Sequence, residues 1–123
     1  LNFVTEPEGE PSAVLLRGLT PVHGLDAICR LRYGKAPDEL TPYQRKNLLN
    51  GPGKCCRALG LDRRQNGLDL TTGETLFLCT SLSDAGLPDR PPRPFTIQTG
   101  KRIGIDYAQE AVDFPWRFYT TDL

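Results

Sequence analysis

The chain has few of the residues that metal sites and redox motifs require. Its 123 residues include one histidine and four cysteines, and no two cysteines stand in a CxxC pair. Zinc sites in proteins are built mostly from such pairs and from histidines, so we expect no zinc or other metal ion. No secretory signal accompanies the cysteines, which are therefore predicted to be reduced thiols, with Cys55 and Cys56 buried or half-buried.

Long apolar runs and methionine are absent as well. No stretch approaches the roughly 20 apolar residues that a membrane-spanning helix needs, so we expect no membrane partner. The chain begins directly on an apolar run at residues 1–4 and contains no methionine, and on this basis we expect a fragment of a longer polypeptide. Its length predicts one domain at most.

A net charge is also lacking, because 15 Lys and Arg balance 15 Asp and Glu. The charge is unevenly spread, however. Residues 30–64 hold nine basic side chains and three acidic ones, and the rest of the chain has the matching negative excess. Such a segment is either a solvated face or a surface that binds an anion such as nucleic acid, and charge alone leaves both alternatives open.

The pattern of apolar residues predicts a mixed fold. Residues 12–19 alternate between two faces as a strand does, and an acidic turn is expected to join them to residues 2–4 in a hairpin. Capping and stop signals predict three helices, at 24–33, from 41 to about 50 and after 54. Further strands are expected at 75–79, 103–107 and 116–118, with a proline-rich surface loop at 87–94.

The sharpest local motif is the sequence NGPGK at residues 50–54, a glycine-rich corner between two predicted helices. Glycines allow close approach to the backbone, and the amides that begin the next helix, with a mobile charge on Lys54, would attract an anion. A P-loop needs Gly in place of Leu48 and Ser or Thr in place of Cys55, so a nucleoside triphosphate site is excluded. A nucleic-acid phosphate remains, and the alternative is an ordinary helix cap with an exposed lysine.

Some other residues allow two interpretations each. Arg17 ends an apolar strand, where a guanidinium either finds an anionic or water partner or extends past the sheet edge to solvent. Asn2 is either a sheet-edge amide or a group that recognises a ligand. His23 is expected to be a surface residue, and residues 115–119 are expected to be a core strand rather than a base-stacking platform.

Taken together, these segments resemble the second half of the methylpurine-DNA glycosylase family. Each matching piece is short, but the pieces occur in the same order along nearly the whole chain, and that succession is specific. They are residues 1–2 (LN), 14–19 (VLLRGL) with Pro21, 24–25 (GL), 50–54 (NGPGK), 58–59 (AL), 68–70 (LDL), 102–105 (RIGI) and 116–119 (WRFY).

The resemblance implies an α+β fold, with a curved antiparallel sheet or partly open β-barrel and flanking short helices, of which residues 1–123 are the C-terminal part. It implies a monofunctional enzyme that flips an alkylated or deaminated purine out of double-stranded DNA and hydrolyses its N-glycosidic bond with water, without a cofactor. Such a protein is expected to be a monomer completed by its own N-terminal half. Its expected location is the bacterial cytoplasm, on the nucleoid, or the nucleus of a eukaryote.

The resemblance also implies roles for individual residues. Arg17 would hold the attacking water and the flipped nucleotide, and the main-chain oxygen of Ile103 would accept a hydrogen bond from the same water. Asn2 and Leu15 would contact the base. The residues expected to contact the DNA backbone are Gly51, Gly53, Lys54 and Arg63.

The catalytic carboxylate is expected to be missing. The family's glutamate and its intercalating tyrosines lie upstream of the position of Leu1, and the acids of this chain, such as Glu6, Glu8 and Asp106, do not match that glutamate. The fragment is therefore expected to be inactive alone. The alternative function is a non-catalytic DNA-binding module that grips phosphate through the two helices and their corner.

Overall fold

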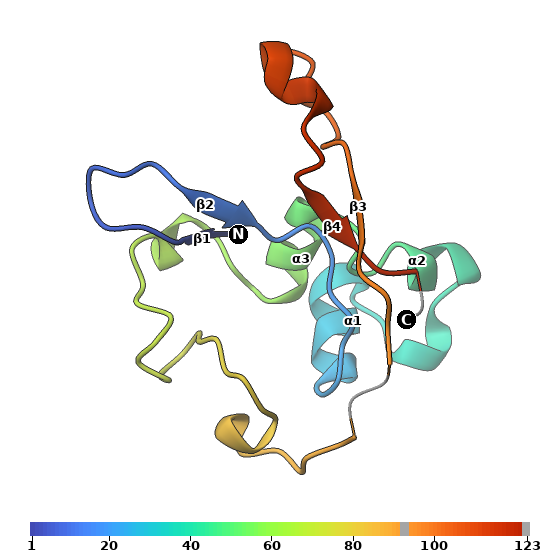
Figure 1. Ribbon diagram of the computed structural model, residues 1–123. Coiled ribbons are helices and arrows are strands. Elements are labelled where there is room, and N and C mark those ends of the chain that lie inside the picture. The colour runs from blue at the N-terminus through green and yellow to red at the C-terminus, as the bar shows by residue number, and fades with distance from the viewer. Residues whose placement is uncertain (92–93, 122–123) are drawn as a thin grey trace. The chain divides into compact units, whose positions relative to one another are not determined.

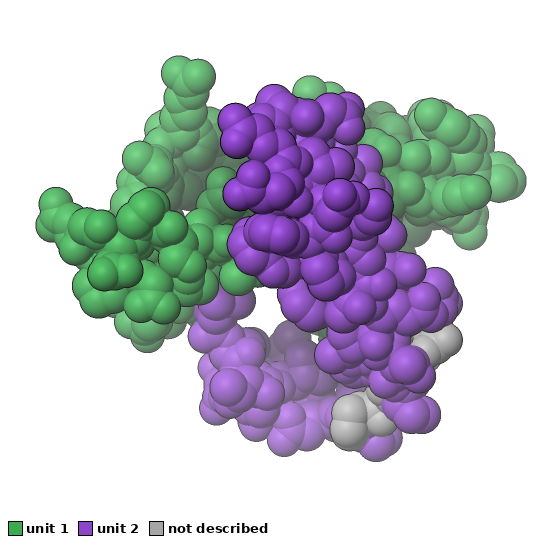
Figure 2. Space-filling view, turned by 45° about the horizontal axis from the view of Figure 1, so that its top comes forward, with its two compact units in different colours: residues 1–77 green, residues 78–123 purple. Residues whose placement is uncertain are grey.

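The structure is a computed structural model that describes residues 1–91 and 94–121. The chain divides into two compact units, residues 1–77 and residues 78–123, shown in different colours in Figure 2. Helical and extended segments occur in both units (Figure 1), so the predicted α+β class is confirmed at this level. None of the described helices has the length and hydrophobicity that crossing a bilayer requires.

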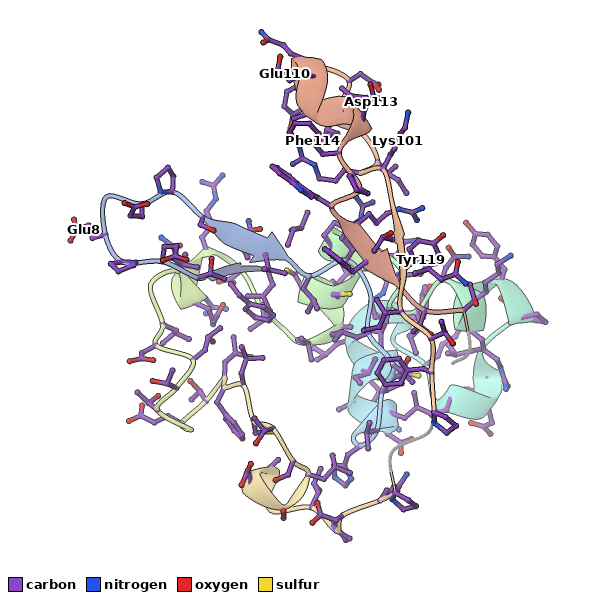
Figure 3. All side chains as sticks on the ribbon, viewed as in Figure 1. Glu8, Lys101, Glu110, Asp113, Phe114 and Tyr119 are labelled. Atoms are coloured by element: carbon purple, nitrogen blue, oxygen red, sulfur yellow. The ribbon has the colours of Figure 1, made fainter. Side chains whose placement is uncertain are left out.

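Unit 1 begins with the predicted hairpin. Strands β1 (Asn2–Val4) and β2 (Ala13–Leu15) are antiparallel, with Asn2 opposite Leu15. The acidic turn joins them, and Glu8 lies at its outer end (Figure 3). β2 is shorter than the predicted strand at 12–19, because beyond Leu16 the backbone pairs elsewhere: the Leu19 N–H donates to the oxygen of Leu49 at 3.2 Å.

Three helices follow, and the sequence signals fix their ends well in two cases. Helix α1 (Leu25–Tyr33) is bounded by Gly24 and Gly34, both with φ near +70°, as the predicted glycine stop requires. Helix α3 (Pro52–Ala58) ends at Gly60, with φ 67°, where the Leu61 N–H donates to the oxygen of Cys56 at 2.8 Å. This arrangement is the Schellman motif that the Leu-Gly-Leu sequence predicts.

Helix α2 (Pro42–Lys46) begins as predicted and ends early. At its start the Gln44 N–H donates to Thr41 Oγ1 at 3.2 Å, and the Thr41 N–H donates to Gln44 Oε1 at 3.0 Å. The predicted continuation to about residue 50 is wrong. In a helix that continued to residue 50, the oxygen of Asn47 would accept from the N–H of Gly51. It accepts instead from Arg32 Nη2 at 3.2 Å and from the Tyr33 hydroxyl at 3.4 Å, and the oxygen of Leu48 accepts from Arg32 Nε at 3.0 Å.

The core of unit 1 lies where α1 packs against α3 and against the connection between α2 and α3. Cys55 and Cys29 are fully buried, Cys56 is half-buried, and all four cysteines are free thiols, as predicted. The Cys55 thiol donates to the oxygen of Leu49 at 3.2 Å, so the cysteine also supports the connection. The buried apolar residues are Cys29, Leu40, Leu48, Leu49, Cys55 and Ala58.

Short 3-10 turns connect the regular elements: η1 (Pro37–Glu39) and η2 (Arg63–Gln65) in unit 1, and η3 (Ser83–Ala85) and η4 (Gln109–Asp113) in unit 2. Strands β3 (Gln98–Gly100) and β4 (Arg117–Tyr119) pair antiparallel in unit 2. They form the stem of an arm whose outer end is η4, and Lys101 forms an ion pair with Asp113, the last residue of η4 (Figure 3).

Two predicted strands are absent from the described structure. Residues 75–79 are irregular, because a short apolar run does not by itself supply the partner strand that backbone groups need. Residues 103–107 form a turn, with Gly104 at φ 73° and the Ala108 N–H donating to the oxygen of Ile105. The surface loop is confirmed at 87–91, and its residues 92 and 93 lie outside the described residues.

The strand at residues 116–118 is confirmed in part, as β4. The expectation that it packs as a core strand is wrong in this structure, since Trp116 is 58% exposed and Phe118 is 69% exposed. The Trp116 ring instead has Phe114 on one side, at 4.8 Å between centroids, and the guanidinium carbon of Arg102 at 5.3 Å. No described side chain of unit 2 is buried, so these aromatics have no core to enter.

Candidate nucleic-acid interface

The glycine-rich corner is a bend whose last residues are helical. Because α3 begins at Pro52, Gly53 and Lys54 stand in its first turn and not before it. Gly51 lies under the Lys54 side chain, since a Cβ at Gly51 would be 3.5 Å from Lys54 Cδ. A Cβ at Gly53 would meet nothing within 4 Å. The outer side of the bend is therefore open at Gly53 and covered at Gly51.

Lys54 is held in place by two asparagines. Its Nζ donates to Asn50 Oδ1 at 2.7 Å and to Asn47 Oδ1 at 3.0 Å. The charge predicted to be mobile is therefore fixed over the bend, because hydrogen bonds from an ammonium group are among the stronger ones that neutral acceptors make. The sequence signal for this network is only a spacing: residues 47, 50 and 54 are three and four positions apart, as side chains meeting across helical turns are.

The bend is also anchored to α1. Arg32 donates from Nε to the oxygen of Leu48 and from Nη2 to the oxygen of Asn47, at 3.0 and 3.2 Å. Tyr33 donates its hydroxyl to the oxygens of Gln44 and Asn47 at 3.3 and 3.4 Å, and its ring lies 4.7 Å from the guanidinium carbon of Arg32. These two residues close the carbonyls left open at the end of α2. In the sequence, Arg32 belongs to the helical pattern at 24–33 and to the basic stretch at 30–64, and neither pattern indicates these main-chain contacts.

Arg17 lies in unit 1, as the bend does, and the segment that carries Arg17 contacts the residue just before the bend. The segment after β2 contacts Leu49, through the Leu19 hydrogen bond and through Gly18, where a Cβ would be 3.5 Å from the oxygen of Leu49. Arg17 itself is half-buried. The structure thus brings the backbone that carries Arg17 to the residue that leads into the bend.

The two predicted base-contacting residues lie opposite each other on the hairpin. Asn2 pairs with Leu15 in the β1–β2 register, and both side chains are exposed. Their end of the hairpin lies beside α3, because the main-chain nitrogen of Leu1 is 3.2 Å from Cys56 Sγ. Asn2, Leu15, Arg17 and Lys54 therefore belong to neighbouring segments of unit 1.

The basic stretch at 30–64 is not one uniform charged face. Arg45 donates to the oxygens of Leu40 and Asp38, and Arg64 pairs with Asp62 at 2.8 Å, which lowers the pKa of that carboxyl through hydrogen bonds from Arg64. Arg63, the predicted phosphate contact in η2, is exposed beside this pair. Several of the basic side chains thus serve the fold, and a simple charge count overstates the anion-binding surface.

Besides Asp62, hydrogen bonds lower the pKa of two described carboxyl groups: Asp69 through hydrogen bonds from Thr71, and Asp84 through hydrogen bonds from Ser81 and Thr80. A general base that works near neutral pH usually has a raised carboxyl pKa. Within residues 1–91 and 94–121, no group of three or more His, Cys, Asp or Glu side chains is arranged to hold a metal ion.

Ile103 lies in unit 2. Its side chain is 56% exposed, and it precedes the turn at Gly104. The water that its main-chain oxygen is expected to share with Arg17 stays a prediction.

The sequence has clear relatives. A family model described as methylpurine-DNA glycosylase (MPG) matches residues 1–123. Three similar proteins each bear the name "Putative 3-methyladenine DNA glycosylase". They come from Clostridioides difficile strain 630 (46% identical, 97% of this chain, 59% of that protein), Bacillus cereus strain ATCC 14579 (44%, 96% and 54%) and Clostridium perfringens strain 13 (42%, 99% and 56%). The chain thus spans little more than half the length of these curated relatives.

Proposed function

Since the chain belongs to the methylpurine-DNA glycosylase family, we propose that it is the C-terminal part of a monofunctional DNA glycosylase that excises alkylated or deaminated purines from double-stranded DNA. The observation that carries the proposal is the family match along all 123 residues. The names of the relatives favour 3-methyladenine among the bases released. The catalytic glutamate is proposed to come from upstream of Leu1.

The chemistry requires a flipped nucleotide, a water and a carboxylate. Departure of the purine leaves positive charge on the sugar, and a carboxylate beside the water both activates it and stabilises that charge. Arg17 is proposed to hold this water and the flipped nucleotide, and the main-chain oxygen of Ile103 to accept from the water. Asn2 and Leu15 would contact the base, and their place beside α3 supports this role.

The grip on the DNA backbone is proposed to come from Lys54, Arg63, the open backbone at Gly53 and the backbone at Gly51, over which the Lys54 side chain lies. Helix α3 has only seven residues, so we assign the attraction for phosphate to the Lys54 ammonium and not to the helix end. The Leu19–Leu49 hydrogen bond supports a shared site, because it ties the Arg17 segment to the start of the bend.

The complete protein is proposed to be a monomeric α+β domain with a curved antiparallel sheet or partly open β-barrel, in which the N-terminal half covers the strands described above. Exposed apolar side chains on both hairpins, among them Val14 and Phe118, support this completion, since monomers seldom leave such surfaces open. The relatives are bacterial, and we place the protein in the cytoplasm, on the nucleoid.

The test is base release by the full-length protein. Duplex oligonucleotides with one hypoxanthine or one ethenoadenine are incubated with protein, and the free base is measured by chromatography, with undamaged adenine as control. We expect release by the full-length protein and none by residues 1–123 alone. Tight DNA binding without release by the full-length protein would favour the non-catalytic module instead, and neither binding nor release would contradict both.

A further inference from the structure

We propose that Asn47 and Asn50 are positioning residues, which hold the Lys54 ammonium ready for a DNA phosphate. The inference rests on the proposed function, since it explains how one of the assigned DNA contacts is prepared. Its basis is the pair of hydrogen bonds from Lys54 Nζ to the two Oδ1 atoms, at 2.7 and 3.0 Å. It does not depend on the end of α3.

The hydrogen bonds fix which way each amide faces. Asn47 Nδ2 donates to the oxygen of Tyr43 at 3.0 Å, so Asn47 Oδ1 points to the bend. Asn50 Nδ2 donates to Asn47 Oδ1 at 3.3 Å, so Asn50 Oδ1 is left for Lys54. The four hydrogen bonds among these side chains and the oxygen of Tyr43 thus agree with one orientation of each amide. In either amide, the flipped orientation would place its Nδ2 donor against the Lys54 ammonium, which is also a donor.

An ammonium group has three N–H donors, and the two asparagines take two of them. The third remains for a phosphate oxygen, and the bond between Lys54 and Asn50 lies at the exposed side of the network. Lysine normally loses much rotamer freedom when it binds, because its side chain has four rotatable bonds. Here the stem already lies against Gly51, so part of that loss occurs on folding and binding costs less.

The network stands on a fixed base. Arg32 and Tyr33 of α1 both bond to the main-chain oxygen of Asn47, which sets the position from which its side chain reaches Lys54. The chain of contacts therefore runs from α1, through the backbone of Asn47, to the ammonium. This support of the Asn47 main chain by α1 favours a fixed position for the Lys54 ammonium over a chance contact of a solvated lysine.

The first test concerns the free protein and does not involve DNA. In the full-length protein labelled with 15N, a lysine ammonium held by hydrogen bonds gives an observable side-chain NMR signal, whereas a freely exchanging one does not. We expect a Lys54 signal, identified by its loss in Lys54→Ala, that disappears in Asn50→Leu and persists in the matched control Asn66→Leu. A signal that survives in Asn50→Leu would overturn the positioning role.

The second test measures affinity for duplex DNA at several salt concentrations. Lys54→Ala is expected to lower the log-log salt slope by about 0.9, the value for one phosphate contact. Lys101→Ala in unit 2 removes the same charge and is the control. Asn50→Leu keeps the charge, so we expect an unchanged slope and about 3- to 10-fold weaker binding, with no further loss when it is added to Lys54→Ala.

A third variant guards against misfolding of the leucine variant. Asn50→Asp preserves the size of the side chain and its acceptor oxygen, but it places a negative charge beside the Lys54 ammonium. The net charge offered to the phosphate is then cancelled, so binding should weaken and the salt slope should fall by about 0.9. Equal or tighter binding by Asn50→Leu, alongside weaker binding by Lys54→Ala, would overturn the inference and leave the proposed function intact. Failure of the unaltered protein to bind DNA would overturn both, whatever the NMR signal shows.

Discussion

Arg17 lies between strand β2 and the contact to Leu49, and it is the residue proposed to hold the attacking water. It is half-buried, at the exit of β2, two residues before the backbone contact to Leu49. If its guanidinium holds the attacking water, Arg17→Ala should slow base release under single-turnover conditions on the order of 100-fold, as loss of a placed donor does in other active sites. Arg17→Lys should recover part of the rate, since it restores the charge without the planar fork. An unchanged rate in Arg17→Ala would remove the residue from the site.

The four thiols should differ sharply in reactivity. Cys79 is exposed, Cys56 is half-buried, and Cys29 and Cys55 are fully buried. Burial raises the pKa of Cys29, the nearby Asp26 carboxylate adds to the shift, and Arg45 opposes it. The folded protein should therefore react with iodoacetamide first at Cys79 and last at Cys29 and Cys55, as read by mass spectrometry of the labelled peptides.

Because the pKa of the Cys29 thiol is raised in the folded protein, its contribution to stability is full below about pH 9 and is lost as the pH rises through the folded value.

At this scale the sequence indicated residue types better than residue partners. The burial of Cys55 followed from its helical neighbours and small size. The fixed position of Lys54 did not, because its asparagine acceptors depend on where α2 ends, and that end depends on Arg32 of another helix. Side-chain networks between elements need coordinates, whereas burial within one element needs only its own pattern.

Alanine should have opposite effects on stability at Gly53, within α3, and at Gly60, just after its end. Gly60 has φ 67°, and a Cβ there would meet only Leu31 Cδ1 at 3.9 Å, so the penalty is conformational and about 1 kcal/mol. Gly53 is helical with open space around it, and Gly53→Ala should stabilise by about 0.5 to 1 kcal/mol. Urea unfolding of the full-length protein measures both. Because Gly53→Ala disturbs nothing in the free protein, any accompanying loss of DNA affinity would report a close approach of DNA, and destabilisation by Gly53→Ala would contradict the open geometry.

Elements with local end signals were predictable, and elements that depend on a distant partner were not. The glycines around α1, the capping Thr41 and the Leu-Gly-Leu end of α3 act within one or two turns, and the structure confirms them. Residues 75–79 are a short, mostly apolar run that follows the turn signal at Thr72-Gly73, yet a strand exists only through a neighbour. Likewise, residues 103–107 turn at Gly104, while β3 forms at 98–100 because β4 lies opposite.

The distribution of buried side chains makes the molecule uneven in stability. Among the residues that the structure describes, the buried apolar ones all fall between Cys29 and Ala58, and no side chain of residues 78–91 or 94–121 is buried. Burial of apolar area is the main favourable term in folding, so α1, α3 and their connection should be the most stable part. The β3–β4 arm is held by its own pairing and by surface contacts such as that between Arg117 and Tyr119, whose guanidinium carbon and ring centroid are 4.2 Å apart.

Hydrogen exchange can therefore test the proposed completion by an N-terminal half. In residues 1–123 alone, amides of α1 and α3 should exchange slowest, and those of β1–β2 and β3–β4 should exchange nearly as fast as in an unfolded chain. In the full-length protein, the same hairpin amides should become at least about 10-fold slower, because added contacts on their apolar side chains raise the free energy of local opening. The α1 amides serve as the internal reference, since their core is already closed. Hairpin amides that exchange at the same rate in both samples would show that the missing half does not cover them, and the proposed single curved sheet would then be wrong.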